Sequence, residues 1–203
     1  MTSPEENKLV LITGATGGIG RATALAFARE GCYDLALHYH TVSIRTQQDL
    51  ATAIRKAVPK GREIKHHFFS ADMSDYARVR ELHAEVASTL GHPSILFNNA
   101  GSGCGFSGVQ SLQDVPIEVF EKCWRVSTGS GILLAQLCLP EMEEQGWGRV
   151  IWCSSVAAFT GGFVGPHYAG AKSAVHGAVH WLAGNVAKKV SCAPSQARCG
   201  KQS

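Results

Sequence analysis

The sequence predicts an α/β fold in which a doubly wound parallel sheet lies between two layers of helices. Three observations predict it. Short apolar runs alternate with longer amphipathic stretches, which is typical of strands joined by crossover helices. A glycine-rich string follows the first apolar run directly and opens the first amphipathic stretch. The length of 203 residues and the hydrophobic fraction of 45% suit one domain with a substantial core.

The N-terminal half supplies two strand and helix pairs. An apolar run at 8–13 (KLVLIT) predicts a buried strand, and residues 18–30 predict the helix that follows it. A second strand is expected at 34–39 (DLALHY). The second helix, at 47–58, ends where Pro59 cannot continue it.

The same alternation continues to the end of the periodic region. We expect, in order, a strand at 63–70, a helix at 75–90, a strand at 94–98, a glycine-rich loop at 101–108, one or two helices within 116–145, a strand at 149–153 and a last helix at 168–190.

Periodicity disappears at Ser191, where the composition turns polar (SCAPSQARCGKQS). We therefore predict a single domain over 1–190 and a disordered or aberrant tail over 191–203. No further strand is expected after the last helix, so the fifth strand would be left as an open edge of the sheet.

Composition excludes several classes of partner and site. The net charge of +3 comes without any basic run, so nucleic acid is not an expected partner. The longest apolar stretches are too short to span a membrane, and the polar start of the chain is unlike a signal peptide, so we expect a cytoplasmic protein. The seven cysteines form no CxxC pair or close Cys/His cluster, and we expect no metal site.

The string at 13–20 (TGATGGIG) predicts a cradle for a pyrophosphate. Glycines let the backbone turn sharply and approach a phosphate, and the next helix offers its first N–H groups. Taken alone, the string is equally compatible with an ordinary tight turn. Its place between the first strand and the first helix favours the dinucleotide-binding arrangement of a Rossmann fold.

The end of the second strand bears on the choice of dinucleotide. An acid there usually accepts the ribose hydroxyls of NAD, but no Asp or Glu occurs between positions 35 and 48. His40, Ser43 and Arg45 could instead receive a 2′-phosphate. This favours NADP(H) over NAD(H), although Arg45 could equally be a solvated residue at the start of a helix.

Tyr168 and Lys172 are four residues apart on the last helix, so they share one face. A tyrosine has a pKa of about 10, but a Lys ammonium about 4 Å away would favour the phenolate by ~4 kcal/mol, or about three pKa units. Ser155 follows the fifth strand, where its hydroxyl could bond a reacting carbonyl. Each feature alone also has a purely structural interpretation, but their order along this fold favours catalysis.

These motifs together resemble the short-chain dehydrogenase/reductase family, and within it the 3-oxoacyl-carrier-protein reductases. The resemblance runs from about residue 8 to 190. It rests on TGATGGIG at 13–20, Asp72 after the third strand, NNAG at 98–101, Ser155 and YAGAK at 168–172.

The resemblance implies a dinucleotide-binding catalytic domain that interconverts a ketone and an alcohol, and a homodimer. Tyr168 would be the general acid/base, Ser155 would polarise the substrate carbonyl, and Lys172 would tune Tyr168 and bind the nicotinamide ribose. The residues implied for the cofactor are Gly14, Gly18, Ile19 and Gly20 at the pyrophosphate, Asp72 and Met73 at the adenine, and Asn99, Ala100 and Gly101 beside the fourth strand.

Two departures from the family pattern leave a second interpretation open. Ser127 stands where relatives usually carry an Asn that supports a proton relay. After the last helix the family continues with a sixth strand, a substrate lid and a seventh strand, on the order of 40–60 residues that we expect to be missing here. The chain could therefore be an impaired, truncated form that retains partial nucleotide binding or pairs with intact relatives.

Overall fold

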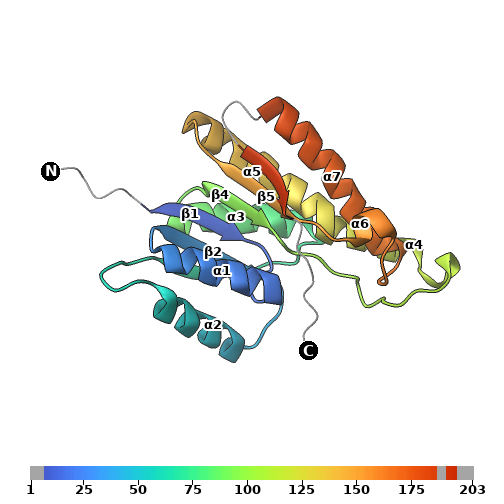
Figure 1. Cartoon of the computed structure of the whole chain (residues 1–203), viewed down its shortest axis with the longest axis horizontal. Helices are drawn as coiled ribbons and strands as arrows, with labels where there is room; N and C mark the ends of the chain where they lie inside the picture. Colours follow the sequence, from blue (N-terminus) through green and yellow to red (C-terminus); the bar gives the residue numbers. More distant parts are fainter. Residues whose placement is uncertain (1–6, 187–190, 196–203) are drawn as a thin grey trace.

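The computed structural model describes residues 7–186 and the backbone of 191–195. A six-stranded parallel sheet in the order β3-β2-β1-β4-β5-β6 forms its centre, with helices on both faces (Figure 1). This confirms the predicted doubly wound α/β fold. The order reverses on either side of β1, which places a crevice for ligands at the carboxyl ends of β1 and β4.

The elements follow one another in the predicted alternation. The strands are β1 (Lys8–Ile12), β2 (Tyr33–Tyr39), β3 (His66–Ser70), β4 (Ile95–Asn98), β5 (Arg149–Cys153) and β6 (Ser191–Ser195). The helices are α1 (Gly18–Glu30), α2 (Ile44–Ala57), α3 (Tyr76–Leu90), η1 (Leu112–Asp114), α4 (Ile117–Trp124), η2 (Arg125–Gly129), α5 (Ser130–Glu144), α6 (Ala157–Thr160) and α7 (Pro166–Val186).

The sheet buries apolar side chains on both faces because successive residues of a strand point to opposite sides. In β1, Leu9 and Leu11 join one core cluster, which includes residues of α3, α5 and α7. Val10 and Ile12 join the other, which includes residues of α1 and α2. Both faces of β1 are therefore packed against helices, which holds its carboxyl end in a fixed position.

The start of α2 lies earlier than the apolar pattern predicts. The Ser43 hydroxyl accepts a hydrogen bond from the backbone N–H of Thr46 at 3.2 Å, which caps the helix, so α2 begins at Ile44. The short helix α6 was not predicted either, since four residues carry no readable period.

Between α4 and α5 the backbone forms a π-helical turn, η2. Gly129 is required there, because a Cβ at this position would overlap the Tyr76 hydroxyl and lie 2.6 Å from the Trp124 ring. A π turn inside a longer helix often marks a functional position. Here it carries Ser127, which is buried.

The prediction of a tail without regular structure from Ser191 is wrong for its first five residues. They form β6, which pairs in parallel with β5 from Arg149↔Ser191 to Cys153↔Ser195. The pairing uses backbone groups of an open sheet edge, which need no apolar pattern, and Pro194 is compatible with an edge strand. β5 is therefore not an edge, and the predicted loss of the sixth strand is also wrong. Residues 196–203 lie outside the described residues.

No helix within the described ranges 7–186 and 191–195 is both long and apolar enough to cross a membrane.

Candidate active site

A cavity of about 500 Å³ opens beyond the carboxyl ends of β1 to β4. Most of the residues implied for the cofactor line it, although they come from four separate segments. These are Gly14, His40, Asp72, Met73, Asn99, Ala100 and Gly101. Thr16 and Gly17 of the glycine-rich string also line it. No site role was predicted for the remaining lining residues, which are His38, Thr41, Val42, Ser102, Cys104, Gly105, Lys122 and Val126.

At two positions of the β1–α1 turn, a side chain larger than glycine would meet neighbouring atoms. Gly14 has a φ of 64°, and a Cβ on it would lie 3.0 Å from Asn99 Nδ2. A Cβ on Gly20 would overlap the Gly14 carbonyl oxygen and lie 2.9 Å from Ala15 Cα. Nothing lies within 4 Å of a Cβ built on Gly18. The turn thus fits a closely approaching pyrophosphate, which the first N–H groups of α1 would face.

Thr13 and Asn99 join this turn to the end of β4. The Thr13 hydroxyl oxygen accepts from the backbone N–H groups of Asn99 (2.8 Å) and Ala100 (2.9 Å). In return, Asn99 Nδ2 donates to the carbonyl oxygens of Thr13 (2.9 Å) and Gly14 (3.1 Å). We call residues 13–20 together with Asn99 and Ala100 the cradle. Its two halves, 86 residues apart in the sequence, are held as one unit.

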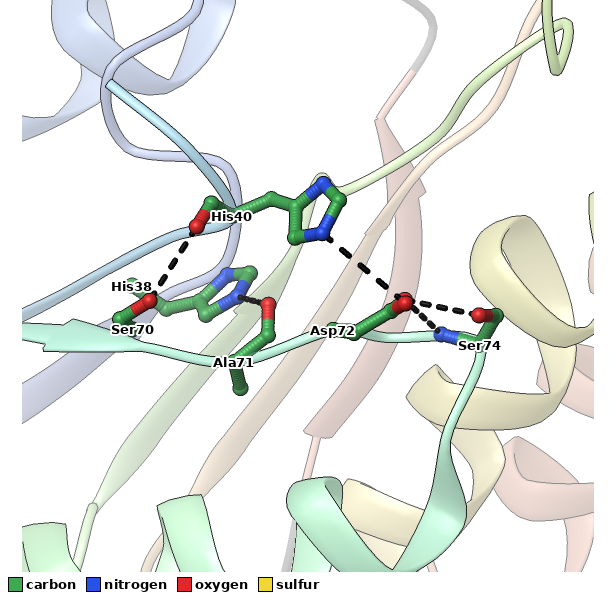
Figure 2. A network of polar contacts seen from close by, with 6 residues as sticks. All are labelled: His38, His40, Ser70, Ala71, Asp72 and Ser74. Atoms are coloured by element: carbon green, nitrogen blue, oxygen red, sulfur yellow. Dashed lines mark hydrogen bonds and ion pairs between the residues drawn. The ribbon is translucent and has the colours of Figure 1, made fainter.

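His38 holds the cradle from the other side, a role that the sequence did not reveal. Its Nδ1 accepts from the Gly14 N–H at 3.1 Å. Its Nε2–H donates to the Ala71 carbonyl at 3.1 Å, as Figure 2 shows. The ring is therefore neutral, with its proton on Nε2. Burial lowers the pKa of His38 to about 4, which keeps it neutral at physiological pH.

His40 and Asp72 face each other at the rim of the cavity (Figure 2). His40 Nε2 lies 3.9 Å from Asp72 Oδ2, and both side chains are exposed enough for solvent to screen the pair. Hydrogen bonds from the backbone N–H of Ser74, and then from its hydroxyl, lower the pKa of Asp72. The Asp72 carboxylate is thereby fixed at the adenine side that the resemblance implies.

Arg45, Gly18, Ile19 and Gly20 are not among the lining residues. Arg45 is exposed on the first turn of α2, and Ile19 is 46% exposed at the start of α1. Ser43 is engaged in capping α2. Of the three residues considered for a 2′-phosphate, His40 alone lines the cavity.

Lys172 lies beneath Tyr168, as their spacing predicts. Its Nζ lies 5.8 Å from the centre of the Tyr168 ring and donates to the Cys153 carbonyl oxygen at 2.7 Å. Burial lowers the pKa of Lys172, and the hydrogen bond fixes α7 against the last residue of β5. Ser155 follows β5 by two residues, and its hydroxyl accepts from the Ala157 N–H at 3.2 Å. We call Ser155, Tyr168 and Lys172 the catalytic end.

Gly101 connects the catalytic end with the cavity. A Cβ on Gly101 would lie 3.2 Å from Lys172 Nζ and 3.6 Å from the hydroxyl oxygen of Ser127. The Ser127 oxygen also accepts from the Ser102 N–H at 3.4 Å. A buried ammonium and a buried hydroxyl thus flank one point of the cavity wall, an arrangement that can position a carbonyl substrate and move a proton.

Comparison with known proteins agrees with this geometry. Residues 8–195 match the family model described as short chain dehydrogenase. L-rhamnose 1-dehydrogenase (NADP(+)) of Thermoplasma acidophilum is 31% identical over 179 residues, covering 88% of this chain and 66% of the relative. D-beta-hydroxybutyrate dehydrogenase of Rhizobium meliloti is 29% identical over 182 residues, covering 89% of this chain and 66% of the relative.

Solved structures show the same fold. A 7α-hydroxysteroid dehydrogenase, complexed with NADH and 7-oxo glycochenodeoxycholic acid, superposes with a TM-score of 0.78 at 26% identity, covering 94% of this chain and 69% of the other. An NADH-dependent reductase responsible for alginate metabolism gives a TM-score of 0.81 at 24% identity, and the match covers 94% of this chain and 76% of the other. The latter likeness concerns the fold alone.

Proposed function

The chain belongs to the short-chain dehydrogenase/reductase family, and we propose that it is an NADP(H)-dependent oxidoreductase that interconverts a ketone and an alcohol. One observation carries the proposal: Gly101 lines the cavity next to the cradle, and a Cβ on it would lie 3.2 Å from Lys172 Nζ and 3.6 Å from the Ser127 hydroxyl oxygen. Binding and proton transfer would therefore occur in one continuous site.

The cradle fits a dinucleotide because its glycines leave room that a Cβ would fill. Gly14, Gly18, Ile19 and Gly20 would hold the pyrophosphate on the first turn of α1. Asp72 and Met73 would border the adenine, and Asn99, Ala100 and Gly101 would line the nicotinamide half. When bound, the nicotinamide supplies or accepts the hydride.

Proton transfer is the task that we assign to the catalytic end. The Ser155 hydroxyl would bond the substrate carbonyl oxygen, and Tyr168 Oη would donate its proton to the same oxygen during reduction. Lys172 would favour the Tyr168 phenolate, since a cation beneath the ring stabilises negative charge on it. An ammonium has three N–H donors, and the Cys153 carbonyl takes one, so others can reach the cofactor ribose.

The preference for NADP(H) rests on the rim of the cavity. The segment after β2 carries no carboxylate up to Gln48, and His40 lines the cavity there. A ring N–H of His40 would donate a hydrogen bond to a 2′-phosphate. Arg45 contributes less, because it projects from the exposed start of α2.

For the substrate we propose a small carbonyl compound, with a 3-oxoacyl thioester as one candidate. The named relatives act on rhamnose and on β-hydroxybutyrate, so sugars and hydroxy acids belong in the same test. The chain spans 66% of the length of these two relatives, and we therefore hold the activity of the whole protein as a proposal.

We also propose a homodimer in the cytoplasm. Two apolar side chains of α4 are exposed, Ile117 at 64% and Trp124 at 42%. Beside Trp124, a cavity of about 490 Å³ lies between α4 and α7. A second copy would cover this face, and light scattering of the purified protein would report a mass of two chains.

A second candidate is nucleotide binding with impaired turnover, and Ser127 favours it. Its hydroxyl is engaged with the Ser102 N–H, whereas an amide side chain would offer more hydrogen bonds for a relay. In this case the chain would bind NADPH or pair with an intact relative without reducing a ketone efficiently.

One experiment separates the two candidates. The purified protein is titrated with NADPH and with NADH by fluorescence, and NADPH oxidation is then followed with sugars, hydroxy and keto acids, and 3-oxoacyl thioesters. Tighter binding of NADPH with turnover of one class supports the reductase. Binding without turnover of any class supports the second candidate. Absence of binding contradicts the reductase and leaves, of the second candidate, only the pairing with an intact relative.

A further inference from the structure

Two thiols beside the cofactor cavity share one acceptor. Cys104 in the loop after β4 and Cys123 in α4 both donate to the Ser102 carbonyl oxygen, at 3.9 and 3.1 Å respectively. Their sulfurs are therefore separated by no more than the sum of these two distances. Burial, and after it the nearby Cys104 thiol, raises the pKa of Cys123 to about 11.

Cys104 is held in a strained conformation at this position. Its φ of 52° is the one positive value found at a non-glycine residue between 7 and 186. Residues other than glycine rarely adopt this backbone conformation, and the exceptions are enriched at functional positions. Its backbone N–H donates to the Ser102 hydroxyl at 2.9 Å, and its side chain, half-buried, lines the cofactor cavity.

We propose that Cys104 and Cys123 form a reversible disulfide that closes the cavity to the nicotinamide cofactor. The regulatory effect rests on the function proposed above, but the disulfide itself does not. The structure holds both cysteines as free thiols, which is the reduced, open state of this switch.

The oxidant that we infer is a hydroperoxide. The more accessible Cys104 thiolate attacks a peroxide oxygen, which breaks the O–O bond and gives Cys104 sulfenic acid and water. The Cys123 sulfur then attacks the Cys104 sulfur, and the sulfenic oxygen leaves as a second water. Two thiols and one hydrogen peroxide thus yield one disulfide and two waters. Because the pKa of Cys123 is raised, this second step is slow at neutral pH and faster in alkali.

The disulfide would change the wall of the cavity. A bond of about 2.05 Å requires the two sulfurs to approach, and rotation of the Cys104 side chain would provide this movement. Both S–H bonds to the Ser102 carbonyl would be lost. Since the Ser102 N–H is bonded to Ser127, and Gly101 and Ser102 line the cavity, the displacement would reach the place where the nicotinamide is expected.

The three other described thiols have different surroundings. Cys153 is buried at the end of β5, and burial raises its pKa. Cys138 is fully buried in the core, and burial raises its pKa to about 12. Cys32 is exposed just before β2, at the amino end of the sheet and so opposite the cavity. Cys32→Ala is therefore a matched control that removes a reactive thiol without touching the pair.

The pairing is tested by peptide mapping of the full chain. The reduced protein is treated with hydrogen peroxide, blocked with an alkylating agent and digested with trypsin without reductant. Cleavage after Lys122 separates the two cysteines into peptides 81–122 and 123–125. We expect these two peptides to be joined in the wild type and in Cys32→Ala, and to be released by dithiothreitol. Their recovery as separate peptides, at a peroxide dose that oxidises Cys32, would overturn the proposal.

The effect on the cavity is tested by NADPH titration. For the wild type, we expect the dissociation constant of NADPH to rise about tenfold or more on oxidation and to recover with dithiothreitol. For Cys104→Ala, we expect the same dissociation constant before and after treatment with peroxide. A joined peptide with unchanged NADPH affinity would refute the closure. If the reduced protein binds no NADPH, the proposed function fails, while the peptide map still decides whether the disulfide forms.

Discussion

The cradle and the catalytic end are built in different ways. In the cradle, side chains from β1, β2 and β4 bond one another's backbone groups, so that Thr13, His38 and Asn99 fix the turn from two sides. The catalytic end depends on one buried lysine held by one carbonyl oxygen, with Tyr168 above it. The turn of the cradle is therefore fixed by several hydrogen bonds at once, as suits a rigid binding surface. The catalytic end places a buried ammonium beneath an aromatic ring, beside the wall of the cavity.

The largest effect on stability is expected from the cradle. In Gly20→Ala the new Cβ would overlap the Gly14 carbonyl oxygen, and we expect the free energy of unfolding to fall by about 3 kcal/mol, with loss of NADPH binding. Urea denaturation measures this change.

Gly18→Ala is the matched control on the same turn. Nothing lies within 4 Å of its added Cβ, and alanine favours a helix, so stability should stay equal or rise slightly. Equal destabilisation by both substitutions would show that close packing is not what the turn requires.

The second effect is the pH dependence of the cradle through His38. Its pKa is about 4 in the folded protein and about 6.5 in the unfolded chain, so the unfolded chain binds protons more readily. The stabilisation is present above pH 6.5 and is lost as the pH falls towards 4. Between pH 7.5 and pH 5 we expect a loss of about 2 kcal/mol.

His38→Gln isolates this contribution, because glutamine does not titrate while the other histidines remain. The stability of the variant, measured by urea denaturation at both pH values, should fall by about 2 kcal/mol less than that of the wild type. Parallel pH profiles would mean that His38 is not neutral in the folded protein.

A third effect concerns the rim of the cradle. His40→Asp places a carboxylate where a 2′-phosphate is expected, and the affinity for NADPH relative to NADH should fall about tenfold. Arg45→Ala should change the same ratio less than threefold, since Arg45 lies outside the cavity wall. A larger change in Arg45→Ala than in His40→Asp would show that the 2′-phosphate binds at the start of α2 rather than at the end of β2.

The smallest effect is expected at Ser127, which lies next to the catalytic end. Ser127→Asn should raise turnover about threefold, because the longer amide can support a proton relay and still accept from Ser102. Ser127→Ala should lower turnover by a similar factor. If kcat is the same in all three proteins, the hydroxyl takes no part in the relay.

The sequence was most informative where a pattern is local. The strands and helices follow the apolar periodicity, and Tyr168 and Lys172 share a face because their spacing requires it. β6 escaped prediction because its pairing with β5 depends on backbone groups at a free edge rather than on its own side chains. The same holds for the early start of α2, which depends on the single cap at Ser43.

The contacts that the sequence could not reveal all join distant segments. His38 bonds Gly14 and Ala71 only because β2 lies between β1 and β3. Similarly, Cys104 and Cys123 look like unrelated residues until the loop after β4 meets α4 at Ser102. Arg45 is near His40 in the sequence, yet it lies on the exposed first turn of α2 and is not among the residues that line the cavity.

The central claim is that binding resides in the cradle and proton transfer in the catalytic end, and Tyr168→Phe tests it most directly. The substitution removes the hydroxyl that we propose as the proton donor and keeps the ring above Lys172. NADPH affinity, measured by fluorescence, should stay within about threefold of the wild type, whereas carbonyl-dependent NADPH oxidation should fall by about a thousandfold. Retention of turnover in this variant would contradict the account.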